Sequence, residues 1–275
     1  MNKIILEREK YIPPELYRYR RIDNENIMCD KHVDALKKDE IYLTSPYLFN
    51  DPYDSAFSID MELFKNSIIL PNMEQKIKEE IVKPKFEKSG IDIKNVENMH
   101  IVYENINVDI SKMDDFIDKN PQIFYNELIK QQIKFRISCY SESPNSILMW
   151  SHYANQHQGF CIGYDTSEIE EEIMKKIYPV FYHETFFQLI ENGDLNDKIF
   201  NSLIKFKDWK YENEWRLISD EKVLCLKPSK IFLGVRFNDE YIDLFKDIAY
   251  EKSCKLYKMK MNYSEYALEY DEIEL

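Results

Sequence analysis

Hydrophobic and polar residues alternate in several short segments of the chain, and the first of these segments carries arginines. In LYRYR, Tyr17 and Tyr19 fall on one face of an expected strand, whereas Leu16, Arg18 and Arg20 fall on the other. A core strand does not need arginines, and a surface strand does not need tyrosines. The segment is therefore predicted to be a strand that holds a charged, flat ligand. The alternative is an arginine paired with a carboxylate of this acidic chain.

The same alternation recurs along the chain, interrupted by stretches of helical period. Strands are predicted at residues 40–45, 133–143, 159–165, 178–183, 213–219, 230–237 and 254–261. Helices are predicted at residues 23–40, with Asp23 or Asn24 as the N-cap, and at 145–157, 167–177, 186–209 and 239–252. Because strands and helices interleave irregularly, the expected fold class is α+β, with a mixed, mostly antiparallel sheet.

A long charged stretch from about residue 61 to residue 130 has helical character and is divided by Pro84 and Pro121. We expect a helical insertion that serves in packing or as a lid. The 275 residues are 44% hydrophobic, which is enough for a sizeable core, and no Pro-, Gly- or Ser-rich linker divides them. Residues 1–275 are therefore predicted to form a single domain with this insertion.

Charge, cysteine content and glycine content narrow the possible functions. A formal net charge of −13 disfavours broad binding to nucleic acid, and the acidic end of the chain is expected to be solvated. Five scattered cysteines fit a reduced, cytoplasmic protein, and no apolar run is long enough for a membrane helix. With five glycines and no GxxxxGK[ST] or GxGxxG, the sequence lacks a glycine-rich phosphate loop.

Polar side chains gather in the segment RISCYS and in the helix predicted after it. Ser138 and Ser141 belong to the expected strand, where hydroxyl groups can bond to a sugar or orient a carboxylate. The helix adds Trp150, His152 and Tyr153. His152 is a candidate base, and the alternative is an ordinary hydrogen-bonded polar residue.

Two glutamates, Glu212 and Glu214, stand two residues apart in WKYENEWRLIS and are expected to share one face of a strand. A carboxylate that faces a developing oxocarbenium ion stabilises it, as in glycosyl transfer. The alternative is a surface pair that bonds to Arg216 or Lys210.

The loop NDPYD contains Asn50, Asp51 and Asp54, but it lacks the remaining ligands of a calcium loop. Proline and Asx residues break a strand, so we expect a turn that orients its neighbours. Neither HExxH nor a Cys/His cluster is present, and no metal site is predicted.

Four segments resemble, in order, the bacterial domain-of-unknown-function family 2971. They are LYRYR, IYLTSPYLFNDPYD, ISCYSESPNSILMWSHYANQHQGFCIGYD and KDWKYENEWRLI, and they span roughly residues 16 to 218. This resemblance names a family and supplies no chemistry.

A second resemblance, to the Arg-Ser-Glu pattern of ADP-ribosyltransferases, does imply chemistry. In those enzymes an early Arg or His binds the phosphates or ribose of NAD, a Ser-bearing strand supports the nicotinamide pocket, and a late Glu stabilises the ribose cation. The resemblance assigns these roles to Arg18 or Arg20, to Ser138 with Ser141, and to Glu214, while Glu212 matches the glutamate that activates an acceptor. The sequence departs from the pattern in having SCYS in place of Ser-Thr-Ser and a long interval between the Arg and Ser segments.

These resemblances imply an ADP-ribosyltransferase-like fold and a transferase that cleaves NAD and passes ADP-ribose to an unknown protein or nucleic-acid acceptor, as a toxin or phage-defence effector. Glu214, Glu212, Arg18 and Ser138 are the expected catalytic residues. Binding of NAD, which is the substrate, is expected to involve Arg20, Tyr17, Tyr19, Ser141, Asn50, Asp51, Trp150, His152 and Tyr153. Two alternatives stay open: a hydrolase or nuclease that uses His152 and acidic residues, and a non-catalytic module that binds a nucleotide or a protein.

Overall fold

The computed structural model describes residues 10–51, 53–54, 135–185 and 199–275. All of them belong to one unit of the chain, built from residues 1–57 and 133–275. The helical insertion predicted at residues 61–130, and with it the arrangement of the chain as a single domain, lies outside the described residues and stays a prediction.

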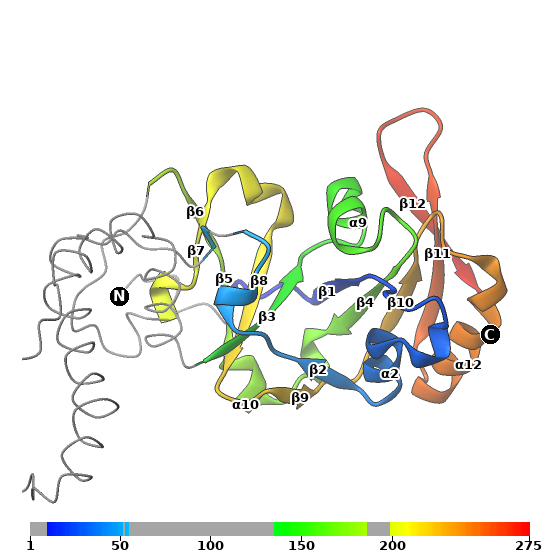
Figure 1. Cartoon of the computed structure of the whole chain (residues 1–275), viewed down its shortest axis with the longest axis horizontal. Helices are drawn as coiled ribbons and strands as arrows, with labels where there is room; N and C mark the ends of the chain where they lie inside the picture. Colours follow the sequence, from blue (N-terminus) through cyan, green and yellow to red (C-terminus); the bar gives the residue numbers. More distant parts are fainter. Residues whose placement is uncertain (1–9, 52, 55–134, 186–198) are drawn as a thin grey trace, which may run out of the picture. The chain divides into compact units, whose positions relative to one another are not determined.

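An eight-stranded sheet organises the described residues, with the order β12-β11-β10-β4-β1-β3-β8-β5 (Figure 1). Neighbouring strands are antiparallel except β10 and β11, which are parallel. This arrangement confirms the predicted α+β class with a mixed, mostly antiparallel sheet. The strands are β1 (Glu15–Arg20), β3 (Arg136–Ser141), β4 (Phe160–Asp165), β5 (Ile177–Pro179), β8 (Glu214–Ser219), β10 (Lys230–Leu233), β11 (Lys255–Met261) and β12 (Leu268–Ile273).

Smaller elements surround this sheet. Strands β2 (Glu40–Tyr42) and β9 (Val223–Cys225) pair antiparallel, and β6 (Phe181–His183) pairs parallel with β7 (Ile204–Phe206). The α-helices are α2 (Lys31–Lys37), α9 (Ile147–Tyr153), α10 (Glu171–Met174) and α12 (Ile242–Lys252). Short 3-10 helices are η2 (Ile27–Cys29), η3 (Pro46–Leu48), η7 (Thr166–Glu168), η8 (Lys207–Glu212) and η9 (Asp239–Tyr241).

The two faces of the sheet bury different hydrophobic clusters. On one face Leu16 packs with residues of α2 and α12, including Val33 and Phe245. On the other face Tyr17 and Tyr19 pack with residues of α9. Figure 1 shows α9 on one side of the sheet and α2 and α12 on the other. The alternation predicted for LYRYR is therefore confirmed, because its two sets of side chains enter two separate cores.

The start of α2 differs from the predicted helix start at Asp23 or Asn24. Asp30 is the N-cap, and its side chain accepts hydrogen bonds from the backbone N–H groups of His32 and Val33. The other carboxylate oxygen accepts from the N–H groups of Asp23 and Asn24. Asp30 is a better cap than either candidate because one buried carboxylate satisfies donors on both sides of the turn.

Two further predictions were wrong in the described residues. Residues 204–206, expected within a helix, form strand β7, where the register pairs Lys205 with Tyr182 of β6. The acidic end of the chain, expected to be only solvated, contains edge strand β12. Its inward residue Leu268 is buried while most of its other side chains are exposed, so the acidic composition hid the strand.

Strands β1 and β3 are neighbours that pair in the described structure at one position, Tyr17 with Ser141. Beyond that position the edge of β3 is taken by Thr44, which exchanges two backbone hydrogen bonds with Ile137 at 2.9 and 2.8 Å. The loop that follows β2 therefore enters between the diverging strands. This fork in the sheet positions the candidate site.

Among the described residues, no helix has the length and apolar character needed to cross a membrane.

Candidate functional site

A cleft of about 570 Å³ lies at the fork between β1 and β3. Its walls come from β1, α2, the loop after β2, β3, α9, β7, η8 and the start of β8. The predicted site residues that line this cleft are Tyr17, Arg18, Tyr19, Arg20, Asn50, Ser138, Ser141, His152, Tyr153, Glu212 and Glu214. Segments more than 190 residues apart in the sequence thus meet in one cavity.

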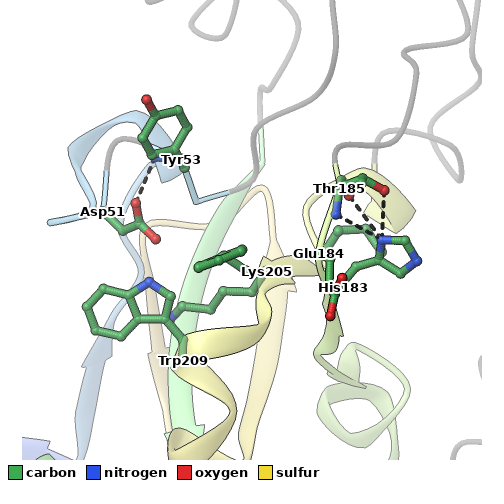
Figure 2. Close-up of a pocket in the computed structure, with 9 residues that line it drawn as sticks. Asp51, Tyr53, His183, Glu184, Thr185, Lys205 and Trp209 are labelled. Carbon is green, nitrogen blue, oxygen red and sulfur yellow. Dashed lines mark hydrogen bonds between the residues drawn. The ribbon is translucent and has the colours of Figure 1, made fainter.

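Trp150 and Asp51 do not line the cleft. Trp150 is fully buried, donates a hydrogen bond from Nε1 to the carbonyl of Pro144 at 2.7 Å, and packs edge-on against Tyr19. Asp51 borders a neighbouring pocket of about 400 Å³ and accepts a hydrogen bond from the N–H of Tyr53 at 2.8 Å (Figure 2). The loop NDPYD therefore contains the expected turn, and Trp150 has a packing role.

Buried charges form one end of the cleft. Glu214 accepts hydrogen bonds from Arg216 Nε at 2.7 Å and from Lys205 Nζ at 2.9 Å, and Arg216 Nη2 also contacts Asp54 at 2.7 Å. These four side chains are at most 9% exposed. We call Asp54, Lys205, Glu212, Glu214 and Arg216 the charge cluster. With every member ionised it holds three negative and two positive charges.

Glu212 joins the cluster from a different direction than expected. It ends the 3-10 helix η8, and Asn213 then adopts a left-handed conformation with φ of 41° before β8 begins at Glu214. The expectation that both glutamates share one strand was therefore wrong. The turn at Asn213 brings both carboxylates to Lys205. The alternative of a surface pair is also wrong, because both glutamates are buried.

Glu212 also has a neutral hydrogen-bond partner, Tyr153, which lines the cleft. Tyr153 of α9 donates a hydrogen bond from its hydroxyl to Glu212 Oε1 at 2.6 Å, and Ser141 donates to the Glu212 carbonyl at 2.7 Å. Burial, followed by the charge of Glu212, raises the pKa of the Tyr153 hydroxyl, which therefore stays protonated and acts as a donor. Glu212 is thus held between a hydroxyl at the cleft and an ammonium group behind it.

The two glutamates differ in their tendency to ionise. For Glu214, burial disfavours the charge, but Arg216 and Lys205 outweigh it and lower the pKa to about 2. For Glu212, burial and then repulsion by Glu214 outweigh the attraction of Lys205, and the pKa is raised above its ordinary value. Glu214 is therefore the more acidic carboxylate of the pair, and Glu212 is the one that takes up a proton more readily.

The opposite end of the cleft is basic. Arg18 is 7% exposed, donates from Nη2 to the carbonyl of Tyr42 at 2.7 Å, and lies 5.8 Å from the centre of the Tyr140 ring. The buried hydroxyls of Ser138 and Tyr140 have no hydrogen-bond partner of normal geometry in the described part of the chain. Burial raises the pKa of Tyr140, and nearby Arg18 and Ser138 partly offset this effect. An arginine beside these two hydroxyls can bind an oxyanion.

The basic and acidic ends lie on opposite faces of the sheet. Directly paired residues of an antiparallel sheet share a face, so Tyr17, Ser141 and Glu214 lie on one side. Arg18 is one residue from Tyr17, and Ser138 is three residues from Ser141. Because side chains alternate along a strand, Arg18 and Ser138 lie on the other face of the sheet. The cleft is bordered by both sets because β1 and β3 diverge beside it.

Sequence reasoning missed the role of Lys205 and underrated that of Arg216. Lys205 was hidden by the helical prediction for its segment. Arg216 was considered as a partner of a surface pair, whereas its side chain is fully buried and also donates to the carbonyl of Ser202. One signal was present in EWRLIS, because a charged pair embedded in an apolar strand indicates buried, paired charges.

Comparison with known proteins adds a family to this geometry. Residues 149–217 match the model of DUF2971, a family of proteins of unknown function. The matched segment runs from α9 to β8 and includes His152, Tyr153, Lys205 and both glutamates, so the resemblance to DUF2971 is confirmed over that part of the chain. No curated protein and no solved structure matches the chain.

Proposed function

We propose that the protein is an ADP-ribosyltransferase-like enzyme that cleaves NAD and transfers ADP-ribose to a protein or nucleic-acid acceptor. The observation that carries the proposal is the convergence of Arg18, Ser138, Glu212 and Glu214 on one cleft. These residues come from three distant segments and are the ones that the Arg-Ser-Glu pattern selects. The ADP-ribosyltransferase-like fold is part of this proposal.

The basic end of the cleft suits the diphosphate of NAD. Arg18 presents a planar guanidinium, and Arg20 lines the same cleft. The hydroxyls of Ser138 and Tyr140, which have no hydrogen-bond partner of normal geometry among the described residues, add donors for oxygen atoms of phosphate or ribose. The tyrosines of β1 are less available for stacking than their sequence suggested, because Tyr17 and Tyr19 are both buried.

The acidic end suits the cation that forms when the bond between ribose and nicotinamide breaks. The fully ionised charge cluster has one excess negative charge, in a buried setting where charge acts strongly. We assign Glu214 to contact the nicotinamide ribose and stabilise its cation. We assign Glu212 to activate the acceptor by taking its proton. Tyr153 and Ser141 hold Glu212 at the cleft.

The test is release of nicotinamide from NAD by the purified protein. Glu214→Gln and Glu212→Gln should each lower the rate by about 10²–10³-fold, which is typical for the loss of one electrostatic contact in a transition state. Glu221→Gln is the matched control, because its side chain is 52% exposed and pairs with Lys176 outside the cleft. Circular dichroism reports folding. Wild-type rates in Glu214→Gln would refute the assignment.

Each alternative function predicts a different result. Binding of NAD in a calorimeter without turnover would favour a non-catalytic nucleotide-binding module, for which the complete pairing of Glu214 with cations is the favouring observation. Activity that chelator abolishes would favour a hydrolase or nuclease using His152. The proposed role as a toxin or defence effector in the cytoplasm predicts that wild-type protein, but not Glu214→Gln, arrests bacterial growth.

A further inference from the structure

Lys205 lies at the centre of the charge cluster. Its Nζ is 2.5 Å from Glu212 Oε2, 2.9 Å from Glu214 Oε2 and 3.5 Å from Asp54 Oδ2, and its side chain is 6% exposed. We infer that Lys205 is a positioning residue that keeps Glu212 ionised and aimed at the cleft. The inference rests on the proposed function for its catalytic meaning, but its test does not use turnover.

The other cation of the cluster is engaged elsewhere. Arg216 donates to Glu214, to Asp54 and to the carbonyl of Ser202. Lys205 donates a hydrogen bond to Glu212. The two cations have different partners because of their shapes. The forked guanidinium of Arg216 bridges Glu214 and Asp54, while the compact ammonium group of Lys205 reaches Glu212.

The groups around Glu212 divide into two sets. Burial and the neighbouring Glu214 favour the neutral form of Glu212, and Asp54 adds a further negative charge to the cluster. The hydroxyl of Tyr153 and the ammonium of Lys205 favour the ionised form. Arg216 of β8 neutralises Glu214, Cys139 of β3 contacts Glu214, and the hydroxyl of Tyr182 of β6 accepts a hydrogen bond from the Glu214 N–H. Within the described part of the chain, removing Lys205 therefore leaves the hydroxyl of Tyr153 to favour the ionised form against burial and repulsion.

The position of Lys205 is fixed by its surroundings. Strand β7 pairs with β6, and the ammonium group lies 5.0 Å from the centre of the Trp209 ring. Figure 2 shows the side chain extending from β7 to this indole. Although burial disfavours the charge on Lys205, the three carboxylates outweigh it and raise its pKa, so the residue stays cationic. A charged group held in one place can orient Glu212.

The experiment uses infrared spectroscopy of the full chain without substrate, since a protonated carboxyl has its own carbonyl band. Lys205→Met should gain, at neutral pH, the band of about one carboxyl per molecule, because a buried charge without a partner takes up a proton. Adding Glu212→Gln should remove the band. Lys205→Arg should suppress it, and Lys207→Met, which alters an exposed lysine nearby, should match wild type.

Three results would overturn the inference. The first is that folded Lys205→Met shows no carboxyl band, and the second is that the band persists when Glu212→Gln is added. The third is that the band is removed by adding Glu214→Gln but not by adding Glu212→Gln. If Lys205→Met fails to fold, the double variant with Glu212→Gln should recover folding, since it removes the unpaired charge. The inference would be contradicted if folding of Lys205→Met were recovered by adding Glu214→Gln but not by adding Glu212→Gln, or by neither substitution. Nicotinamide release is measured separately, so an inactive wild type with the expected infrared result would refute the proposed function and leave the role of Lys205 standing.

Discussion

The buried charges of this protein depend on one another. Arg216 is fully buried and contacts both Glu214 and Asp54, and Lys205 contacts those two acids and Glu212. Burying a charge is costly unless partners compensate it, so each member of the cluster requires the others. Substitutions inside the cluster therefore affect stability as well as chemistry.

We predict that Arg216→Met lowers the free energy of unfolding by about 3–5 kcal/mol, because it leaves Glu214 and Asp54 without this partner in a buried site. Urea denaturation followed by circular dichroism measures the change. Arg21→Met is the control, since the Arg21 side chain is 62% exposed in its pair with Asp23 and should change stability by no more than about 1 kcal/mol. Equal stability of the two variants would contradict a cohesive role for Arg216.

The pKa of Glu214 predicts how stability changes with acid. Its folded-state pKa of about 2 lies below the ordinary 4.5, so its contribution is complete above about pH 4.5 and is lost as the pH falls towards 2. Glu212 acts with the opposite sign, because its raised pKa makes its ionised form unfavourable to folding. Protonation of Glu212 removes that cost above about pH 4.5, before the loss from Glu214 begins.

We therefore expect Glu214→Gln to lose less stability than wild type between about pH 4.5 and pH 2, when both are unfolded with urea across this range. The exposed Glu221→Gln serves as the control and should follow wild type. Parallel curves for wild type and Glu214→Gln would show that the carboxyl of Glu214 does not titrate as described.

Residue type and strand position were enough to bring most of the candidate residues to one cleft. Arg18 was selected because a core strand does not need an arginine, Ser138 and Glu214 were selected by the Arg-Ser-Glu resemblance, and all three line the cavity. Lys205 carried no such signal, because a lysine in a charged, apparently helical segment is expected to be solvated. The left-handed turn at Asn213 was also hidden, since any of several residue types can adopt it.

At the scale of elements, the junction of α9 with β4 is unusually tight. Asn155, Gln156 and His157 have φ values of 47°, 54° and 70°, so three consecutive residues adopt the left-handed conformation. The carbonyl of His157 then accepts a hydrogen bond from the N–H of Arg236. A Cβ placed on Gly234 would lie 2.1 Å from that carbonyl oxygen, so only glycine fits there.

We predict that Gly234→Ala lowers the free energy of unfolding by about 1–3 kcal/mol or more, because two backbone segments must separate. Gly163→Ala is a matched comparison in β4, where the nearest atom to a new Cβ is Cε1 of Tyr17 at 3.2 Å. A side chain can yield more readily than a backbone, so Gly163→Ala should be the milder change in a thermal or urea unfolding series. The reverse order would contradict the close approach at Gly234.

Long alternating segments were predicted well, and so were the short elements β2, β6 and α10, whereas β7, β9 and β12 were missed. Strands β3, β4, β8, β10 and β11 lie within predicted strands, and β1 begins one residue before its predicted start, because each has an inward row of apolar residues. Strand β9 has three residues, too few for a period to be recognised, and β12 has an outward face rich in carboxylates. The strand order also escaped prediction, since pairing depends on contacts between distant segments.

For the molecule as a whole, the edge strand β12 protects the sheet. Its acids pair with lysines of β11, including Lys260 with Asp271 at 2.7 Å and Lys255 with Glu272 at 3.3 Å. A charged edge discourages pairing with another sheet. The β12 strand also covers Tyr257 and Met259, which are buried in the core on that side.

Deleting residues 262–275 should therefore expose the edge of β11 and cause association, which light scattering and size-exclusion chromatography detect. The control is Tyr263→Ser with Tyr266→Ser, because both rings are almost fully exposed in the connection between β11 and β12 and their loss leaves β12 in place. A truncated protein that stays monodisperse at the same concentrations would contradict this role of β12.

The single pairing of Tyr17 with Ser141 gives the sheet a mechanical property. Strands β12, β11, β10, β4 and β1 form one continuous ladder, and β3, β8 and β5 form a second, with this pair as the rung that joins them. Strands paired at many positions resist rotation relative to each other, whereas strands paired at one position rotate more easily about that pair. Arg18 is carried by the first ladder, and Ser138 with Glu214 by the second. A rotation about the Tyr17–Ser141 pair would therefore change the distance from Arg18 to Ser138 and to Glu214 together, while Ser138 and Glu214 keep their places relative to each other on the paired strands β3 and β8.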